Sequence, residues 1–183
     1  MISFTRGATL LATAAAIAAI APSTALAASS APTGTTPKVT PRKLLASHEL
    51  WGTIDVCNPV KHPNAVGIRG SMPGDGKPHD KMYMSFRLQY LDPTTSGWID
   101  VASGSTPTFV AVGAGTSARQ GGTTFQLVPV AGKPAVTFRG VVDFEWRRGS
   151  KVIVSAARTT TAGHKAVAGA EPAGYNAATC PIG

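Results

Sequence analysis

The chain contains 183 residues, of which 43% are hydrophobic and 14% are charged, so it has enough apolar side chains to build a core. Its formal net charge is +8, but residues 47–183 hold 13 Lys and Arg against 9 Asp and Glu, a net of +4. This mild excess favours acidic partners only weakly. No basic run contains interleaved aromatic residues, and we therefore expect no nucleic-acid binding.

The first 27 residues have the three parts of a secretory signal peptide. Arg6 precedes an apolar run over residues 8–20, and Ala25-Leu26-Ala27 supplies small residues two positions apart. A membrane-spanning helix needs about 20 apolar residues, and the shorter run here makes an uncleaved anchor the less favoured alternative. The sequence therefore predicts a mature protein that begins at Ala28, is secreted, and has no stable membrane span after processing.

Residues 28–46 follow with a different composition. They are rich in Pro, Ser, Thr and Gly and contain few residues that a core could bury. A segment of this composition does not recover the entropy lost on ordering. We expect a flexible linker over residues 28–46 and one folded domain over residues 47–183, a length that suits a single core.

Short segments with the pattern of β-strands occupy most of the predicted domain. Turn signals rich in Gly, Pro, Asn and Asp separate them, and no long helical period occurs. The predicted strands are residues 50–57, 65–72, 81–91, 97–101, 108–113, 123–130, 136–147 and 151–158. The Gly- and Pro-interrupted segment 162–180 is predicted to be irregular. This organisation predicts an all-β sandwich or barrel.

Residues 136–158 give the strongest hairpin signal. Apolar residues alternate with polar ones up to Trp146, and the pattern breaks at Arg148-Gly149-Ser150, where Gly149 can adopt positive φ. Val152, Val154 and Ala156 then continue an apolar face on the returning strand. We expect Trp146 to lie in the core, on the same face as Phe144.

The sequence contains two cysteines, Cys57 and Cys180. In an exported chain an even number of cysteines predicts a disulfide, and two free thiols are the less favoured alternative. A metal site would need further ligands, and only His62 lies near Cys57. A Cys57–Cys180 disulfide would place the two ends of the domain side by side.

The sequence shows no established catalytic or metal-binding motif. Neither a G-x-S-x-G elbow nor an H-E-x-x-H helix occurs, and His48, His62, His79 and His164 are scattered, so we expect no metal site and no cofactor. Asp75 and Asp80 suggest a calcium loop, but the adjacent lysines favour an ordinary polar connection.

Two further groups of residues suggest functional sites. Asp143 and Glu145 share the outer face of one strand and suggest a pair of catalytic carboxylates, but the flanking arginines favour cross-strand ion pairs. Trp51, Trp98 and Trp146 suggest a sugar-binding platform, which competes with packing in the core.

Several segments together resemble secreted immunoglobulin-like or fibronectin-III-like β-sandwich proteins of actinobacterial type. These segments are "GIRGSMPG", "YMSFRLQY", "VVDFEWRRG" and the closing "TTTAGH…PAGYNAATC". The resemblance implies a single antiparallel immunoglobulin-like sandwich of about seven to eight strands, an extracellular location and no assigned activity. The chain departs from antibody-type domains, in which the disulfide joins two central strands and the conserved tryptophan lies earlier in the chain.

We therefore expect a secreted, non-catalytic module that binds a ligand or forms part of the cell envelope. The alternative is a small secreted enzyme or enzyme inhibitor without a recognisable motif. In an immunoglobulin-like sandwich, the loops after the second and the penultimate strands meet at one end. This predicts a basic rim on mobile loops, which either are ordinary solvated loops or bind an anionic cell-wall polymer or another extracellular protein. The predicted rim residues are Lys77, His79, Lys81, Arg147, Arg148 and Lys151.

Overall fold

The computed structural model describes residues 39–101 and 108–183. One short helix precedes nine strands in this part of the chain. In chain order the elements are α1 (Pro41–Leu45), β1 (Trp51–Cys57), β2 (Ala65–Met72), β3 (Lys77–Leu91), β4 (Trp98–Asp100), β5 (Val110–Gly115), β6 (Arg119–Gln126), β7 (Val136–Arg148), β8 (Lys151–Thr159) and β9 (Cys180–Ile182). No helix within these described residues is long and apolar enough to cross a membrane.

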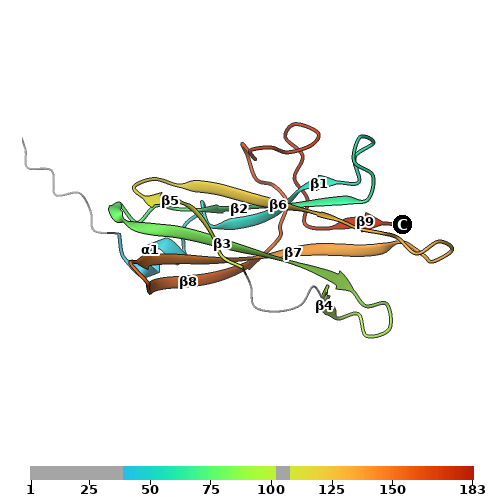
Figure 1. The fold of residues 1–183 in the computed structure, drawn as a ribbon, viewed down its shortest axis with the longest axis horizontal. Helices are drawn as coiled ribbons and strands as arrows, with labels where there is room; N and C mark the ends of the chain where they lie inside the picture. Colours follow the sequence, from blue (N-terminus) through green and yellow to red (C-terminus); the bar gives the residue numbers. More distant parts are fainter. Residues whose placement is uncertain (1–38, 102–107) are drawn as a thin grey trace, which may run out of the picture. The chain divides into compact units, whose positions relative to one another are not determined.

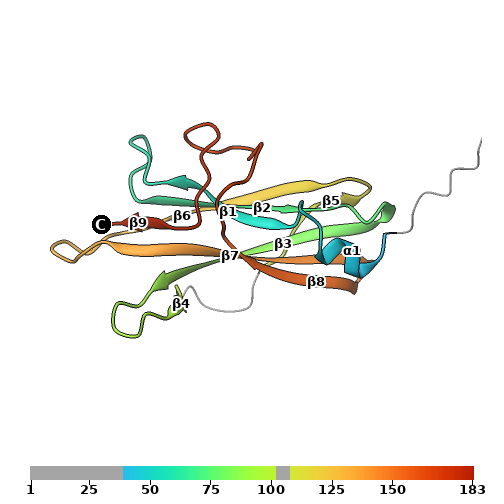
Figure 2. The same cartoon turned by 180° about the vertical axis from the view of Figure 1, so that it is seen from behind.

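The strands form two antiparallel sheets that face each other (Figure 1). The three-stranded sheet has the order β1-β2-β6. The six-stranded sheet has the order β4-β3-β7-β8, with β5 also paired to β3 and β9 also paired to β7. The reverse view in Figure 2 shows the same two layers. The predicted all-β sandwich is confirmed, with nine strands where seven to eight were expected.

The core lies between the sheets and receives fully buried side chains from both. The three-stranded sheet contributes Ile54 and Ile68, and the six-stranded sheet contributes Met84, Phe144 and Trp146, all of which have no exposed surface. The Trp146 indole N–H donates a hydrogen bond of 3.0 Å to the carbonyl oxygen of Pro73. A buried indole with its donor satisfied is stabilising, and the prediction that Trp146 packs in the core is confirmed.

The predicted β7–β8 hairpin is also confirmed, with one correction on the returning strand. Gly149 turns the chain with a φ of 59°. Trp146 pairs with Val154, but Arg147 pairs with Val152, so Ile153 is an extra residue in β8. Such a bulge reverses which residues face inward. Val152 is consequently 42% exposed, although the alternation predicted that it faces the core.

Residues 160–179 connect β8 to β9 without regular secondary structure, as predicted. This crossover segment runs along the free edge of β1, where Ile54 exchanges backbone hydrogen bonds with Ala177 and the N–H of Glu171 donates to the carbonyl oxygen of Asp55. The edge strand β1 is therefore shielded from pairing with another chain.

A disulfide joins Cys57, at the end of β1, to Cys180, at the start of β9, with their Cα atoms 5.6 Å apart. The predicted pairing is confirmed. The bridge links the two sheets and fastens the crossover segment to the strand that it covers.

The N-terminal part of the chain requires a correction of the predicted domain boundary. The predicted signal peptide and residues 28–38 of the predicted linker lie outside the described residues. Residues 39–46, however, are part of the fold: Thr40 caps α1, and Leu44 is only 3% exposed in the core cluster. Leu44, within the sequence "KLL", packs into the core. The average composition of residues 28–46 does not show this single buried residue.

Candidate functional site

The structure brings the two groups of predicted rim residues together. β3 pairs with β7 so that Asp80 lies opposite Arg148 and Lys81 lies opposite Arg147. Across the next strand pair, Arg148 lies opposite Lys151. The starts of β3 and β8 and the end of β7 therefore meet at one end of the sandwich, where Figure 1 also shows the β5–β6 turn. We call this region the basic end.

The rim residues lie on strands, which corrects the expectation that mobile loops carry them. β3 begins at Lys77, β7 extends to Arg148 and β8 begins at Lys151. Only residues 73–76 and 149–150 remain as connections at this point. Strand pairing extends this far because the buried Asp80 and its partner Arg148 supply a cross-strand ion pair at the last register position.

Asp80 organises the centre of the basic end. Its side chain has no exposed surface and accepts two hydrogen bonds from Arg148, of 2.7 Å from Nε and 2.8 Å from Nη2. The Nζ atom of Lys77 lies 3.8 Å from the same carboxylate. The hydrogen bonds from Arg148 hold the pKa of Asp80 below its ordinary value, against the opposing effect of burial. Asp80 is therefore ionised in the folded protein.

Asp75 occupies the β2–β3 connection beside this pair and is only 5% exposed. Its Oδ1 atom accepts a hydrogen bond of 2.9 Å from the backbone N–H of Lys77. Burial raises the pKa of Asp75, and the adjacent Asp80 carboxylate raises it further. Both carboxylates that suggested a calcium loop are thus occupied by protein cations, Lys77 and Arg148.

Arg147 is held in place in a different way. Its guanidinium forms an ion pair with Glu145 and lies over the ring of Tyr83, 4.3 Å from the ring centroid, and 5.0 Å from the centroid of Phe109. Such a cation–π contact restrains the guanidinium. Three of the six predicted rim residues, Lys77, Arg147 and Arg148, therefore have acidic partners within the protein.

The other three predicted rim residues are exposed. His79, Lys81 and Lys151 form no ion pair among the described residues. Lys81 and Lys151 flank the Arg147–Arg148 segment on its two neighbouring strands. They present positive charge from a rigid backbone.

A pocket of about 280 Å³ opens at the same end, on the outer side of the three-stranded sheet. Ser71 pairs with Trp51 on one side and with Gln120 on the other, so one row of three strands forms its floor. Its lining residues are His48, Glu49, Trp51, Ser71, Ala118, Arg119, Gln120 and Lys165. The sequence singles out Trp51 as a possible sugar contact and His48 as one of four scattered histidines, but it gives no signal for the other lining residues, because β6 was expected to begin at residue 123 and the crossover segment has no periodic pattern.

The crossover segment closes one wall of this pocket. His164 stacks on the ring of Trp51 with the ring centroids 4.4 Å apart and an interplanar angle of 14°. Burial lowers the pKa of His164, so its imidazole is neutral at neutral pH. The Gln120 side chain donates to the carbonyl oxygen of Ala166 and accepts from the N–H of Ala168.

Arg119 and Lys165 are the cations of the pocket. Both are exposed, and among the described residues neither forms an ion pair. Glu49 is the one carboxylate in the lining. The lining therefore includes two cations, one carboxylate and an indole ring.

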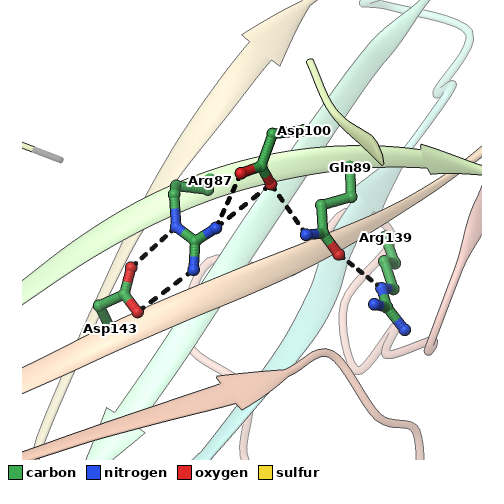
Figure 3. A network of polar contacts seen from close by, with 5 residues as sticks. All are labelled: Arg87, Gln89, Asp100, Arg139 and Asp143. Carbon is green, nitrogen blue, oxygen red and sulfur yellow. Dashed lines mark hydrogen bonds and ion pairs between the residues drawn. The ribbon is translucent and has the colours of Figure 1, made fainter. Parts of the chain in front are cut away.

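Of the two suggested catalytic carboxylates, Asp143 belongs to the network of Figure 3 on the outer face of the six-stranded sheet, and Glu145 pairs with Arg147. Arg87 donates to Asp143 at 3.0 Å and to Asp100 at 3.0 Å. Gln89 joins Asp100 to Arg139 through hydrogen bonds of 2.8 Å on each side. Asp143 is thus in a cross-strand ion pair as predicted, but with Arg87 of β3, whereas Glu145 pairs with the flanking Arg147 on its own strand.

The three tryptophans do not form a common platform. Trp146 is in the core, Trp51 lines the pocket on the three-stranded sheet, and Trp98 on β4 lies under the Arg139 guanidinium, 4.3 Å from the ring centroid. Comparison with known proteins adds no relative to this geometry, because no protein-family model and no curated protein matches the sequence.

Proposed function

We propose that this protein is a secreted, non-catalytic β-sandwich module of the cell envelope that binds an anionic polymer at its basic end. The observation that carries the proposal is a set of four exposed cations at this end of the fold that form no ion pair within residues 39–101 and 108–183: Lys81, Lys151, Arg119 and Lys165. The resemblance to secreted immunoglobulin-like proteins and the signal-like first 27 residues support the extracellular location.

The way in which charges are paired supports a polymeric anion as the ligand. At the basic end the acidic groups Asp80, Asp75 and Glu145 are buried or half-buried and contact Lys77, Arg148 or Arg147. Lys81 and Lys151, which form no ion pair in the described part of the chain, are exposed beside these pairs. Surface cations of one sign raise the local concentration of an oppositely charged partner.

The spacing of these cations favours an extended ligand over a single small anion. Lys81 and Lys151 lie on the six-stranded sheet, whereas Arg119 lies on the three-stranded sheet and Lys165 on the crossover segment. A chain that carries charges at intervals can contact several of them at once and gain from effective concentration. The disulfide between Cys57 and Cys180 suits an oxidising compartment.

The test is sedimentation of the purified protein with isolated bacterial cell walls at low and at physiological ionic strength. The test variant is Lys81→Glu with Lys151→Glu, which leaves the Asp80–Arg148 pair intact. The matched control is Lys61→Glu with Lys133→Glu. It changes the net charge equally at two exposed positions in the β1–β2 and β6–β7 connections, at the opposite end of the sandwich.

We expect wild type and control to sediment with the walls at low salt and to be released as ionic strength rises to about 0.15 M, where the Debye length is about 8 Å. The test variant should remain in the supernatant. Equal sedimentation of the two variants would refute the basic end as the binding surface, and failure of the wild type to sediment at low salt would refute wall binding itself.

A further inference from the structure

We propose that the pocket beside Trp51 binds one acidic sugar unit of the polymer, so that the protein recognises a carboxylated polysaccharide and not anionic charge alone. This inference rests on the proposed function, because the pocket adjoins the surface assigned to the polymer. The argument uses the size of the pocket, its aromatic ring and the arrangement of its charged groups.

The size of the pocket restricts the ligand to a small unit. Its volume is about 280 Å³, just below the range of about 300–1,000 Å³ found for sites that bury drug-sized ligands. The pocket is partly open, so a unit within a longer chain can enter from the side while its neighbours stay outside.

The ring of Trp51 provides the apolar contact that a sugar requires. His164 covers one face of the indole, which leaves at most the other face for a ligand. A pyranose presents C–H groups on its ring faces, and the flat indole offers a matching apolar surface with a polar N–H at its edge. Because His164 is neutral, it does not compete with Arg119 and Lys165 for the ligand's negative charge.

The charged groups indicate both the anion and the hydroxyl groups of an acidic sugar. Arg119 and Lys165 both line the pocket, and their positive charges favour a carboxylate, although the Arg119 side chain runs beside Gly113 of β5. Glu49 accepts hydrogen bonds and repels a second nearby anion. An acidic peptide would place further carboxylates beside Glu49, whereas a sugar supplies hydroxyl donors for it.

The polar floor of the pocket is held in place before a ligand binds. The side-chain amide of Gln120 makes a hydrogen bond of 3.1 Å to Ala166 and one of 3.0 Å from Ala168. Thr161 and His164 are joined by a hydrogen bond of 2.8 Å between Oγ1 and Nε2. A site fixed by such contacts loses little conformational entropy on binding.

The experiment is calorimetric titration of the wild type with three probes of similar length: the trisaccharide of galacturonic acid, the neutral trisaccharide of galactose, and triglutamate. We expect the galacturonic acid trisaccharide to bind at least about tenfold more tightly than either of the other probes. This corresponds to the loss of either the ionic or the stacking contribution, each worth about 1.4 kcal/mol. Equal binding of the galacturonic acid trisaccharide and triglutamate would overturn the proposal in favour of recognition of charge alone.

Two variants locate the site. Trp51→Leu should weaken binding of the galacturonic acid trisaccharide about tenfold, and Arg119→Gln with Lys165→Gln should reduce it to the level of the neutral trisaccharide. Lys61→Gln with Lys133→Gln is the control for charge, and the thermal midpoint of each variant reports its folding. The double Gln variant keeps the Trp51 ring, so it tests the site even if Trp51→Leu fails to fold. Unchanged affinity in that variant overturns the proposal, while wall sedimentation at low salt reports separately on the proposed function.

Discussion

The outer faces of the two sheets differ in what covers them. On the three-stranded sheet, Thr53 and Asp55 point away from the core and yet are 0% and 2% exposed. Thr53 donates a hydrogen bond to the carbonyl oxygen of Ala177 in the crossover segment. On the six-stranded sheet, the corresponding outward residues form the polar network of Figure 3, where Arg87 keeps a third of its side-chain surface.

Because of this difference in cover, an aspartate–arginine ion pair lies in a buried environment on one face and in a more exposed environment on the other. Each face carries an aspartate–arginine pair, Asp55 with Arg69 at 2.8 Å and Asp143 with Arg87 at 3.0 Å. Below the crossover segment, burial raises the pKa of Asp55 in opposition to the charge of Arg69. On the other face the hydrogen bond with Asp143 is the main cause of the raised pKa of Arg87. Both pairs lie on antiparallel strands, so the different burial of Asp55 and Asp143 comes from the crossover segment that covers the three-stranded sheet.

Removing the disulfide should have the largest effect, because it releases the end of the segment that covers the three-stranded sheet. The double variant Cys57→Ser, Cys180→Ser opens a loop with a sequence separation of 123 residues. We expect a loss of about 4 kcal/mol in the free energy of unfolding, within the usual range of about 2–5 kcal/mol. Urea denaturation under non-reducing conditions measures it. A loss below about 1 kcal/mol would mean that packing alone holds the crossover segment in place.

A matched pair of variants tests the covered and the open face directly. Asp55→Ala leaves Arg69 without its partner under the crossover segment, and we expect a cost of about 3 kcal/mol. Asp143→Ala removes an equivalent carboxylate from the open face, where Arg87 keeps Asp100 as a partner, and should cost about 1 kcal/mol or less. Chemical denaturation of both variants gives the comparison. Equal costs would show that the crossover segment does not change the energetics of the pair.

The pH dependence of stability sharpens the same contrast. Burial raises the pKa of Asp55 in the folded protein above its ordinary value of 3.8. As pH rises above that value, the unfolded chain therefore holds fewer protons at this position than the folded chain, and stability falls until Asp55 is ionised in both states. In Asp55→Asn this contribution is absent. The stability of the wild type relative to Asp55→Asn should thus decrease as pH increases through this window. Urea denaturation at several pH values measures it. An increase would mean that Arg69 lowers the pKa of Asp55 more than burial raises it.

The open face is also the part of the molecule that the sequence predicted best. In β7 the alternation that ends at Phe144 and Trp146 separates buried from outward residues, because the outer side of that strand keeps its polar character. β1 gave a weaker signal, since five consecutive residues of this strand are buried on both faces. The segment that buries them carries no periodic pattern of its own, so its packing position could not be predicted.

The candidate site was predicted only in part, for the same physical reason. Residues on β3 and β7 could be placed together because strand order determines which ends meet. The pairing of Arg148 with Asp80 depends on the burial of Asp80, which the sequence pattern does not give. Lys165 lines the same pocket as Trp51 only because the irregular crossover segment returns over the three-stranded sheet, and no local signal indicated that path.

The bulge in β8 provides the smallest expected effect and the most local test of which face a residue occupies. Alternation from Val154 would place Val152 in the core, but the extra residue Ile153 turns Val152 outward on the open face beside Arg147. Val152→Thr should therefore change the free energy of unfolding by no more than about 0.5 kcal/mol, as is usual at the surface. Val154→Thr, at a position 8% exposed, buries a hydroxyl group and should cost about 1–2 kcal/mol.

Because both changes replace Val by Thr in the same strand, β-propensity and loss of the methyl group are matched, and the difference measured by denaturation reports burial alone. If Val152→Thr were the more costly of the two, the register of β8 would have to be the unbulged one, and the outward position of Val152 on the six-stranded sheet would be wrong.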